Sequence, residues 1–258
     1  MCVNTGGRAH CQNEPAALTG ETPVTSVYPM RMADSPPTLL LLSGGMDSAT
    51  CLWWMRANLT ADVHAVCIDY HQRHRIELEY AAVLAQQATV ATHTVLEIDL
   101  ASIGGSPLTD DNIDVPSASE DQQSVTVVPY RNLLFVAAAA ARAQSLEIDD
   151  IYIAPVRDDS AAYRDCRREF YDSLEQTLRL GAPADGRITI HTPFVDMWKR
   201  DVIRIGLELG VPYEMTHTCY SGRRPACGIC DACVERIDAF RANGVADPLD
   251  YEIDIDWA

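Results

Sequence analysis

Six consecutive residues, five of them small or polar, follow a short apolar run near the start of the chain. Residues 39–42 are all leucine, residues 43–48 read Ser-Gly-Gly-Met-Asp-Ser, and the residues after them favour a helix. This order brings backbone N–H groups and a helix N-terminus to one point, which is where proteins bind anions. The Ser43 and Ser48 hydroxyls can donate hydrogen bonds, and the Asp47 carboxylate can hold a magnesium ion beside a phosphate. The pattern predicts a phosphate-binding loop.

Four cysteines near the other end of the chain have the spacing of a metal site, C-x7-C-x2-C-x2-C. They are Cys219, Cys227, Cys230 and Cys233. Two overlapping C-x2-C pairs let successive thiolates turn onto one ion, and four sulfurs satisfy tetrahedral zinc with no open position. The closed shell predicts a structural zinc site rather than a hydrolytic one. An iron–sulfur cluster, which also takes four thiolates, is the alternative.

Strands and helices alternate through the middle of the chain and would position these residues. We expect strands at 38–42, 63–69, 93–98, 150–155 and 188–192, and helices at 46–56, 75–88, 131–144, 165–179 and 199–209. Such alternation is typical of an α/β fold with a doubly wound parallel sheet, here of about five strands. Right-handed crossovers would place the ends of the first two strands at one edge, where ligands bind. The polar residues 101–128 predict a long excursion or lid.

The same pattern divides the chain into three parts. Residues 1–37 carry five prolines and no sustained apolar period, which predicts a flexible tail. Residues 38–212 hold the phosphate loop and the α/β alternation. Residues 213–258 hold the four cysteines and are expected to form a small zinc knuckle with helices.

Composition restricts the function further. The chain has 37 acidic against 20 basic residues and a net charge of −17, which argues against direct nucleic-acid binding through a basic face. No apolar run approaches the roughly 18 residues of a membrane span, and the N-terminus lacks a signal-peptide pattern. Cysteines at metal spacing favour the reducing cytoplasm as the location.

The loop and four further segments resemble a known family. The loop is similar to the Ser-Gly-Gly-x-Asp-Ser loop (PP-loop) of ATP pyrophosphatases, which split ATP between the α and β phosphates. The further segments are residues 68–74 (Ile-Asp-Tyr-His-Gln-Arg-His), 128–134 (Val-Pro-Tyr-Arg-Asn-Leu-Leu), 163–170 (Tyr-Arg-Asp-Cys-Arg-Arg-Glu-Phe) and 191–194 (His-Thr-Pro-Phe), the last leading to Lys199. Together with the four cysteines they resemble the 7-cyano-7-deazaguanine synthase family over about residues 38–240.

This resemblance implies a fold like that of the adenine nucleotide alpha hydrolases and a ligase of queuosine and archaeosine precursor synthesis. Such an enzyme activates the carboxylate of 7-carboxy-7-deazaguanine with ATP, adds ammonia to form an amide, and then dehydrates the amide to a nitrile. The resemblance implies ATP, Mg²⁺ and Zn²⁺ as cofactors. It also implies small-molecule substrates and a homodimer, without a membrane or nucleic-acid partner.

The resemblance also assigns roles to individual residues. The ATP-binding set is Leu42, Ser43, Gly44, Gly45, Met46, Asp47, Ser48 and Asp69. The catalytic set is Asp47, Ser48 and Lys199, and the substrate-binding set is Arg131, Asn132, Asp165 and Arg167. Lys199 is the only lysine in the chain, which suits a specific phosphate contact. Arginine suits a carboxylate because its planar fork binds both oxygens.

Three positions depart from the family pattern. Tyr130 replaces a glycine, Arg164 replaces a proline, and Arg157 lies in an altered segment after the fourth strand. We expect Tyr130 and Arg157 to reshape one wall of the substrate pocket. This leaves open an alternative, a ligase that joins a deazaguanine carboxylate to another amine, including one on a protein partner. A tRNA-modifying enzyme and an inactive domain with a zinc interaction module are the remaining alternatives.

Overall fold

The structure is a computed structural model that describes residues 35–118, 123–183 and 186–257. The predicted tail, residues 1–37, falls almost wholly outside the described residues. Residues 31–258 belong to one compact unit, so the predicted parts 38–212 and 213–258 both lie within it. Among the described residues, the helices are too short or too polar to span a membrane.

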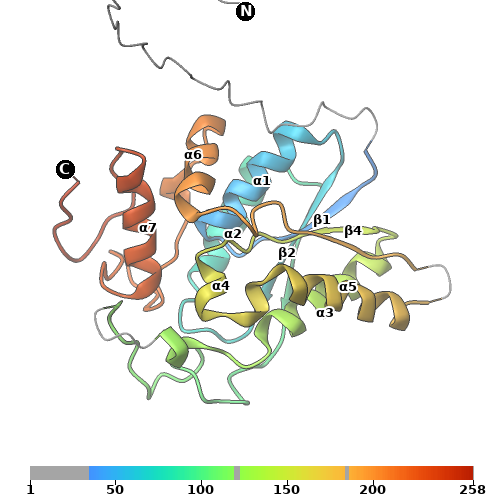
Figure 1. Cartoon of the computed structure of the whole chain (residues 1–258), viewed down its shortest axis with the longest axis horizontal. Coiled ribbons are helices and arrows are strands. Elements are labelled where there is room, and N and C mark those ends of the chain that lie inside the picture. Colours follow the sequence, from blue (N-terminus) through green and yellow to red (C-terminus); the bar gives the residue numbers. More distant parts are fainter. Residues whose placement is uncertain (1–34, 119–122, 184–185, 258) are drawn as a thin grey trace, which may run out of the picture. The chain divides into compact units, whose positions relative to one another are not determined.

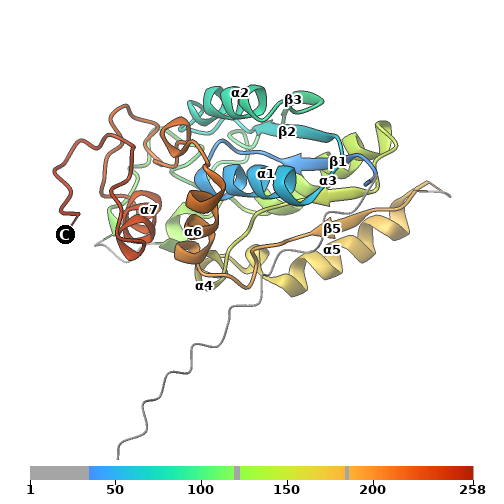
Figure 2. The same ribbon diagram turned by 90° about the horizontal axis from the view of Figure 1, so that it is seen from above.

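Five parallel strands form one sheet in the order β3-β2-β1-β4-β5. Figure 2 labels β3, β2, β1 and β5 in this order across the sheet. The strands are β1 (Thr38–Leu41), β2 (Val63–Asp69), β3 (Thr92–Glu97), β4 (Asp150–Tyr152) and β5 (Thr189–His191). The predicted doubly wound parallel sheet is therefore confirmed. Strand order reverses at β1, so a crevice opens at the carboxyl ends of β1 and β4.

Helices cover both faces of the sheet (Figure 1). They are α1 (Met46–Asn58), α2 (Glu77–Gln87), α3 (Arg131–Ser145), α4 (Asp159–Ala162), α5 (Arg168–Gly181), α6 (Lys199–Leu209) and α7 (Asp231–Ala242). The alternation of side chains along β1 separates the two cores, because Leu40 packs with α1, α2 and α6 whereas Leu39 packs with α3. The sheet is thus buried on both faces, as parallel sheets are.

The helix predicted over residues 165–179 begins later than expected. Residues Arg164–Cys166 form a separate 3-10 turn, η3, and Arg167 is extended before α5 starts at Arg168. This break turns the Arg167 side chain away from the direction that a continuous helix would give it.

The excursion predicted over residues 101–128 is anchored to the core in its described part. Leu108 and Val128 are buried with α3 and β2, and the Leu108 carbonyl accepts a hydrogen bond from the Arg73 N–H at 2.8 Å. The Ala118 N–H donates to the Ile229 carbonyl, also at 2.8 Å, so the excursion contacts the cysteine loop as well. These contacts hold its described part against the core and the cysteine loop.

Candidate active site

The predicted phosphate loop joins β1 to α1 and is held by its own hydrogen bonds. The Ser48 hydroxyl donates to the Gly45 carbonyl at 3.1 Å and lies 3.0 Å from the Ser43 hydroxyl. Gly44 has φ +90°, and a Cβ there would lie 2.1 Å from the Glu77 carbonyl oxygen, so only glycine fits. Among the residues that the structure describes, no side chain caps the N-terminus of α1. The loop is therefore preformed, with helix N–H groups directed at a prospective anion.

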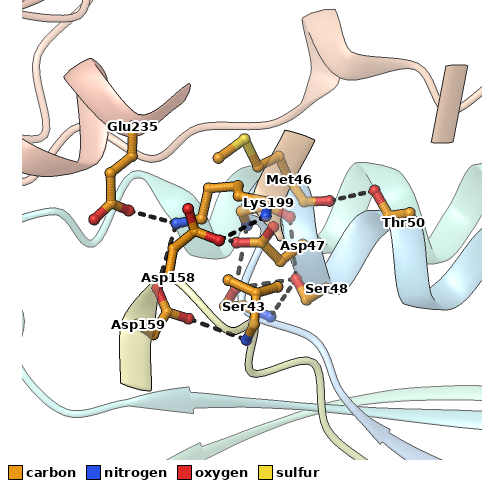
Figure 3. Close-up of polar contacts among 11 residues, drawn as sticks. Ser43, Met46, Asp47, Ser48, Thr50, Asp158, Asp159, Lys199 and Glu235 are labelled. Atoms are coloured by element: carbon orange, nitrogen blue, oxygen red, sulfur yellow. Dashed lines mark hydrogen bonds and ion pairs between the residues drawn. The ribbon is translucent and has the colours of Figure 1, made fainter. Parts of the chain in front are cut away.

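Lys199 lies at the first position of α6 and points into a group of carboxylates (Figure 3). Its Nζ is 2.5 Å from Glu235 Oε2 on α7 and 3.3 Å from Asp159 Oδ1 on α4. Asp47 Oδ2, in the phosphate loop, is 3.8 Å away. Three segments far apart in sequence thus converge on one buried ammonium group.

The charges in this group are unequal, with three carboxylates around one ammonium. Burial would lower the pKa of Lys199, but the carboxylates around it raise that pKa well above its usual value. Burial raises the pKa of Asp47 to about 7, although Lys199 opposes the shift. Asp47 Oδ1 is buried without a hydrogen-bond partner among the described residues. An excess of carboxylate oxygens with one unpartnered acceptor suits a hard divalent cation such as Mg²⁺.

A cavity of about 280 Å³ extends from this group along the carboxyl ends of β1, β2 and β4. We call its two ends the lysine end and the arginine end. The lysine end consists of Ser43, Asp47, Ser48, Asp159, Lys199 and Glu235. The arginine end consists of Tyr70, His74, Arg131, Asn132 and Tyr220. Apolar side chains also line the cavity, including Ile68, Phe135 and Ile153, and could pack against a flat ring.

The arginine end has a cation without a counter-ion. Among the described residues, no carboxylate oxygen lies within 4.0 Å of the Arg131 guanidinium, which is 6.0 Å from the Tyr70 ring centroid. The Tyr70 hydroxyl lies 3.1 Å from His74 Nε2. Burial lowers the pKa of His74 to about 3, so this imidazole is neutral at pH 7. Arg131 therefore carries the net charge of this end and suits an anionic ligand.

Glu77, on the cavity wall at the start of α2, was not predicted from the sequence. Burial raises its pKa to about 8, although a hydrogen bond from Gln72 Nε2 at 3.1 Å opposes the shift. The available signal was its position three residues beyond the segment 68–74. Asp159 and Glu235 were also missed, because no local spacing links either of them to Lys199.

The structure brings most of the predicted site residues to the cavity. The residues that line it are Leu42, Ser43, Gly45, Met46, Asp47, Ser48, Arg131, Asn132 and Lys199. Gly44 shapes the loop behind them. The lining of the cavity does not include Asp69, Asp165 or Arg167.

These three residues have other contacts. Asp69 forms an ion pair with Arg75 and accepts a hydrogen bond from the His71 N–H at 3.1 Å. The Asp165 carbonyl accepts from Asn132 Nδ2 at 3.2 Å, so Asp165 supports a cavity residue through its backbone. Arg167 Nε donates to the Ser160 carbonyl at 3.0 Å and lines a separate hollow.

The expected reshaping of the pocket wall by Tyr130 and Arg157 is wrong. Tyr130 keeps a backbone conformation suited to glycine, with φ 56° and ψ 20°, and its side chain is 76% exposed. Arg157 stacks 4.4 Å above the Trp198 ring. Neither residue is part of the cavity lining, and Arg157 lines a separate hollow.

The four predicted cysteine ligands converge at the N-terminus of α7. Their sulfur atoms all lie within 4.8 Å of one another, and Cys227 Sγ is 3.9 Å from Cys233 Sγ. Sulfurs around tetrahedral zinc, at Zn–S of about 2.3 Å, are about 3.8 Å apart. Backbone N–H groups of Cys227 and Cys230 also donate to sulfurs in the cluster, at 3.3 and 3.4 Å. The cluster fits a zinc site.

Comparison with known proteins agrees with this geometry. The family described as queuosine biosynthesis protein QueC matches residues 37–244. The chain belongs to the QueC family. It is 44% identical to the 7-cyano-7-deazaguanine synthase of Persephonella marina over 223 residues, covering 84% of this chain and 97% of that protein. It is 41% identical to the enzyme of the same name from Nostoc punctiforme, covering 83% and 98%.

Among solved structures, the chain is similar to NMN synthetase from Francisella tularensis, with a TM-score of 0.44 and 15% identity over 81% of this chain and 77% of that one. The QueC match includes both ends of the cavity and all four cysteines. It ends at residue 244, so the last residues of the chain lie beyond it.

Proposed function

We propose that this QueC family member, a 7-cyano-7-deazaguanine synthase, converts 7-carboxy-7-deazaguanine and ammonia to the nitrile through an adenylated carboxylate and an amide. The observation that carries this mechanism is one cavity with two different ends. A preformed phosphate loop and a lysine form one end, and an unpaired arginine forms the other. ATP and an anionic acceptor can therefore be held together.

At the lysine end, the loop N–H groups and the Ser43 and Ser48 hydroxyls would donate to the phosphates of ATP. Lys199 would add a cation close to the phosphate loop, held by Glu235. Asp47, with its unpartnered oxygen, would hold Mg²⁺, which supplies positive charge against the phosphates. These groups would stabilise the charge that develops as pyrophosphate leaves.

At the arginine end, Arg131 would hold the acceptor carboxylate and Asn132 would hydrogen-bond to the heterocycle. A carboxylate oxygen attacks the α-phosphorus of ATP, and pyrophosphate leaves. Ammonia then attacks the carbonyl carbon, AMP leaves with the carboxyl oxygen, and a proton is lost to give the amide. A second ATP adenylates the amide oxygen and pyrophosphate leaves, and loss of AMP and of both amide protons then gives the nitrile.

We assign zinc to the four-cysteine cluster in a structural role. Four thiolates leave no open coordination position for a substrate. The cluster includes Cys230 and Cys233 at the start of α7, the helix that carries Glu235. Zinc would thus stabilise the helix that faces Lys199.

Ammonia is favoured over another amine as the nucleophile. The motive for another amine was an altered pocket wall, and neither of the two residues concerned lines the cavity. The homodimer and the cytoplasmic location implied by sequence stay predictions, and sedimentation of the purified chain tests the first of them.

Incubation of the purified protein with 7-carboxy-7-deazaguanine, ammonium and ATP tests the proposal. Mass spectrometry should detect the nitrile, with two AMP released for each. Arg131→Gln should raise the KM for the carboxylate by about 10- to 100-fold and leave the KM for ATP unchanged. Arg168→Gln is the control, because Arg168 forms an exposed ion pair with Asp196. Absence of AMP release by the wild type would contradict the proposal.

A further inference from the structure

A completely buried ion pair lies behind the lysine end. Arg236 Nε is 2.6 Å from Asp247 Oδ2, and Arg236 Nη2 is 2.8 Å from Asp247 Oδ1. Both side chains are 0% exposed. This two-point geometry fixes the relative orientation of the segments that carry the two residues.

The two partners come from different parts of the chain. Arg236 follows Glu235 on α7, whereas Asp247 belongs to the C-terminal segment that lies beyond the QueC match. The Tyr251 hydroxyl donates to Asp247 Oδ2 at 2.5 Å. In the cysteine loop, the Ala226 N–H donates to the carbonyl of residue 250 at 2.9 Å, and the Ala226 carbonyl accepts from the N–H of residue 252 at 2.8 Å. The C-terminal segment is therefore tied both to α7 and to the metal loop.

The remaining donors of Arg236 hold a second segment. Nη1 donates to Thr216 Oγ1 at 2.6 Å, and Nη2 donates to the Tyr213 carbonyl at 3.0 Å. The next residue, His217, donates its N–H to the Gly44 carbonyl of the phosphate loop at 3.0 Å. Arg236 thus supports the loop that carries Ser43 and Ser48.

The lysine end is therefore supported from two sides by one ion pair. On one side α7 presents Glu235 to Lys199, and on the other residues 213–217 hold the phosphate loop. Within the described part of the chain, no hydrogen bond connects Arg236 or Asp247 to the arginine end.

We propose that Asp247 is a positioning residue for ATP binding, acting through Arg236 on Glu235, Lys199 and the phosphate loop. The inference rests on the proposed function, because it takes the lysine end as the ATP site. Without the Asp247 carboxylate, the Arg236 guanidinium is a buried charge lacking its counter-ion, and α7 moves to bring it a new partner. The movement displaces Glu235, and with it Lys199. Small displacements of positioning groups weaken binding and catalysis strongly.

The test uses the full chain with Asp247→Asn, which keeps the side-chain shape, and Tyr251→Phe, which removes only one hydrogen bond to Asp247. Glu252→Gln is the matched control, because it lies in the same segment and loses only an exposed ion pair with Arg223. For each protein, the melting temperature, the metal content, the dissociation constant for ATP and the KM for the deazaguanine carboxylate are measured well below the melting temperature.

Asp247→Asn should raise the ATP dissociation constant at least about tenfold while the KM for the carboxylate stays within about twofold. Tyr251→Phe should show the same selectivity with a smaller effect, and it decides the question if Asp247→Asn does not fold. Glu252→Gln should match the wild type. Equal fold-changes in the ATP dissociation constant and in the KM for the carboxylate, or no change in ATP affinity, would overturn the inference.

The proposed reaction and the proposed role of Asp247 can be disproved independently of each other. If the wild type binds ATP but forms no nitrile, the reaction is wrong, and the ratio of ATP dissociation constants still decides the role of Asp247. If the wild type does not bind ATP, both the proposed reaction and the proposed role of Asp247 are wrong.

Discussion

The two ends of the cavity hold their cations in opposite ways. At the lysine end, Lys199 has three carboxylates around it before any ligand arrives. At the arginine end, Arg131 has no carboxylate within 4.0 Å among the described residues. A neutralised lysine offers little net attraction to an anion, so phosphate binding there must depend on the preformed loop and on a divalent cation. An unpaired arginine attracts a carboxylate directly.

The ends also differ in how they are supported. Gly44, the serine hydroxyls and the buried Arg236–Asp247 pair fix the lysine end through hydrogen bonds. The arginine end rests mainly on aromatic packing, with Tyr70 beside Arg131. We infer that geometry sets ATP binding and that charge sets the choice of acceptor.

The largest effect is expected from substitutions that remove the metal and phosphate contacts of the lysine end. Asp47→Ala or Ser48→Ala should leave a folded protein whose ATP-dependent turnover falls by about 100-fold or more, because these side chains act on charge that develops in the reaction. Release of AMP and pyrophosphate measures the loss, and circular dichroism checks the fold. Unchanged pyrophosphate release in either variant would contradict the assignment of this end to ATP.

The metal cluster should affect stability more than chemistry. Cys230→Ser should lower the melting temperature and solubility more than it lowers kcat, because a structural zinc ion contributes folding free energy. Metal analysis of the wild type should give one zinc per chain. Cys51→Ala, on the buried side of α1, should keep the metal. Iron with a visible chromophore, or no metal, would refute the zinc assignment.

A smaller effect concerns pH and the buried Glu77 carboxyl. Its folded pKa of about 8 lies above the ordinary value of 4.5, so the folded state binds the extra proton. Stability is then fully present below about pH 4.5 and decreases as pH rises towards 8, by on the order of 4 kcal/mol from this group. Asp47, with a pKa raised to about 7, adds to the same decrease.

Glu77→Gln should flatten that decrease in denaturant titrations between pH 5 and 8 without removing it. Glu79→Gln on the same helix is the control, because Glu79 is exposed and pairs with Arg224. If the free energy of unfolding changes with pH equally in Glu77→Gln and in the wild type, the inference that the Glu77 carboxyl is protonated in the folded protein is wrong.

The smallest effect is expected at Tyr130, which lies outside both ends. Tyr130→Gly should change the free energy of unfolding by less than about 1 kcal/mol, because relief of the left-handed backbone and the gain in unfolded-state entropy oppose each other. The product should remain the nitrile, and both KM values should match those of the wild type. A shift between amide and nitrile would show that the tyrosine ring reaches the acceptor.

The features that the sequence determined by itself are those encoded by short spacing. Residues 43–48 specify the phosphate loop because its glycines, serines and helix start act within one turn of chain. The C-x2-C pairs specify the cysteine cluster for the same reason, and alternating apolar segments specify the parallel sheet. Arg131 and Lys199 were predicted through resemblance, not through spacing.

Only the tertiary structure decided how these parts act together. Glu235 and Asp159 meet Lys199 because α7 and α4 pack beside α6, a contact between residues roughly 40 positions apart. The same packing joins Arg236 to Asp247 and directs Tyr130 to solvent. Sequence spacing cannot report such contacts, because burial and charge depend on which segments the folded chain brings together. The state of Arg131 follows from the same packing, because among the described residues no carboxylate oxygen lies within 4.0 Å of its guanidinium.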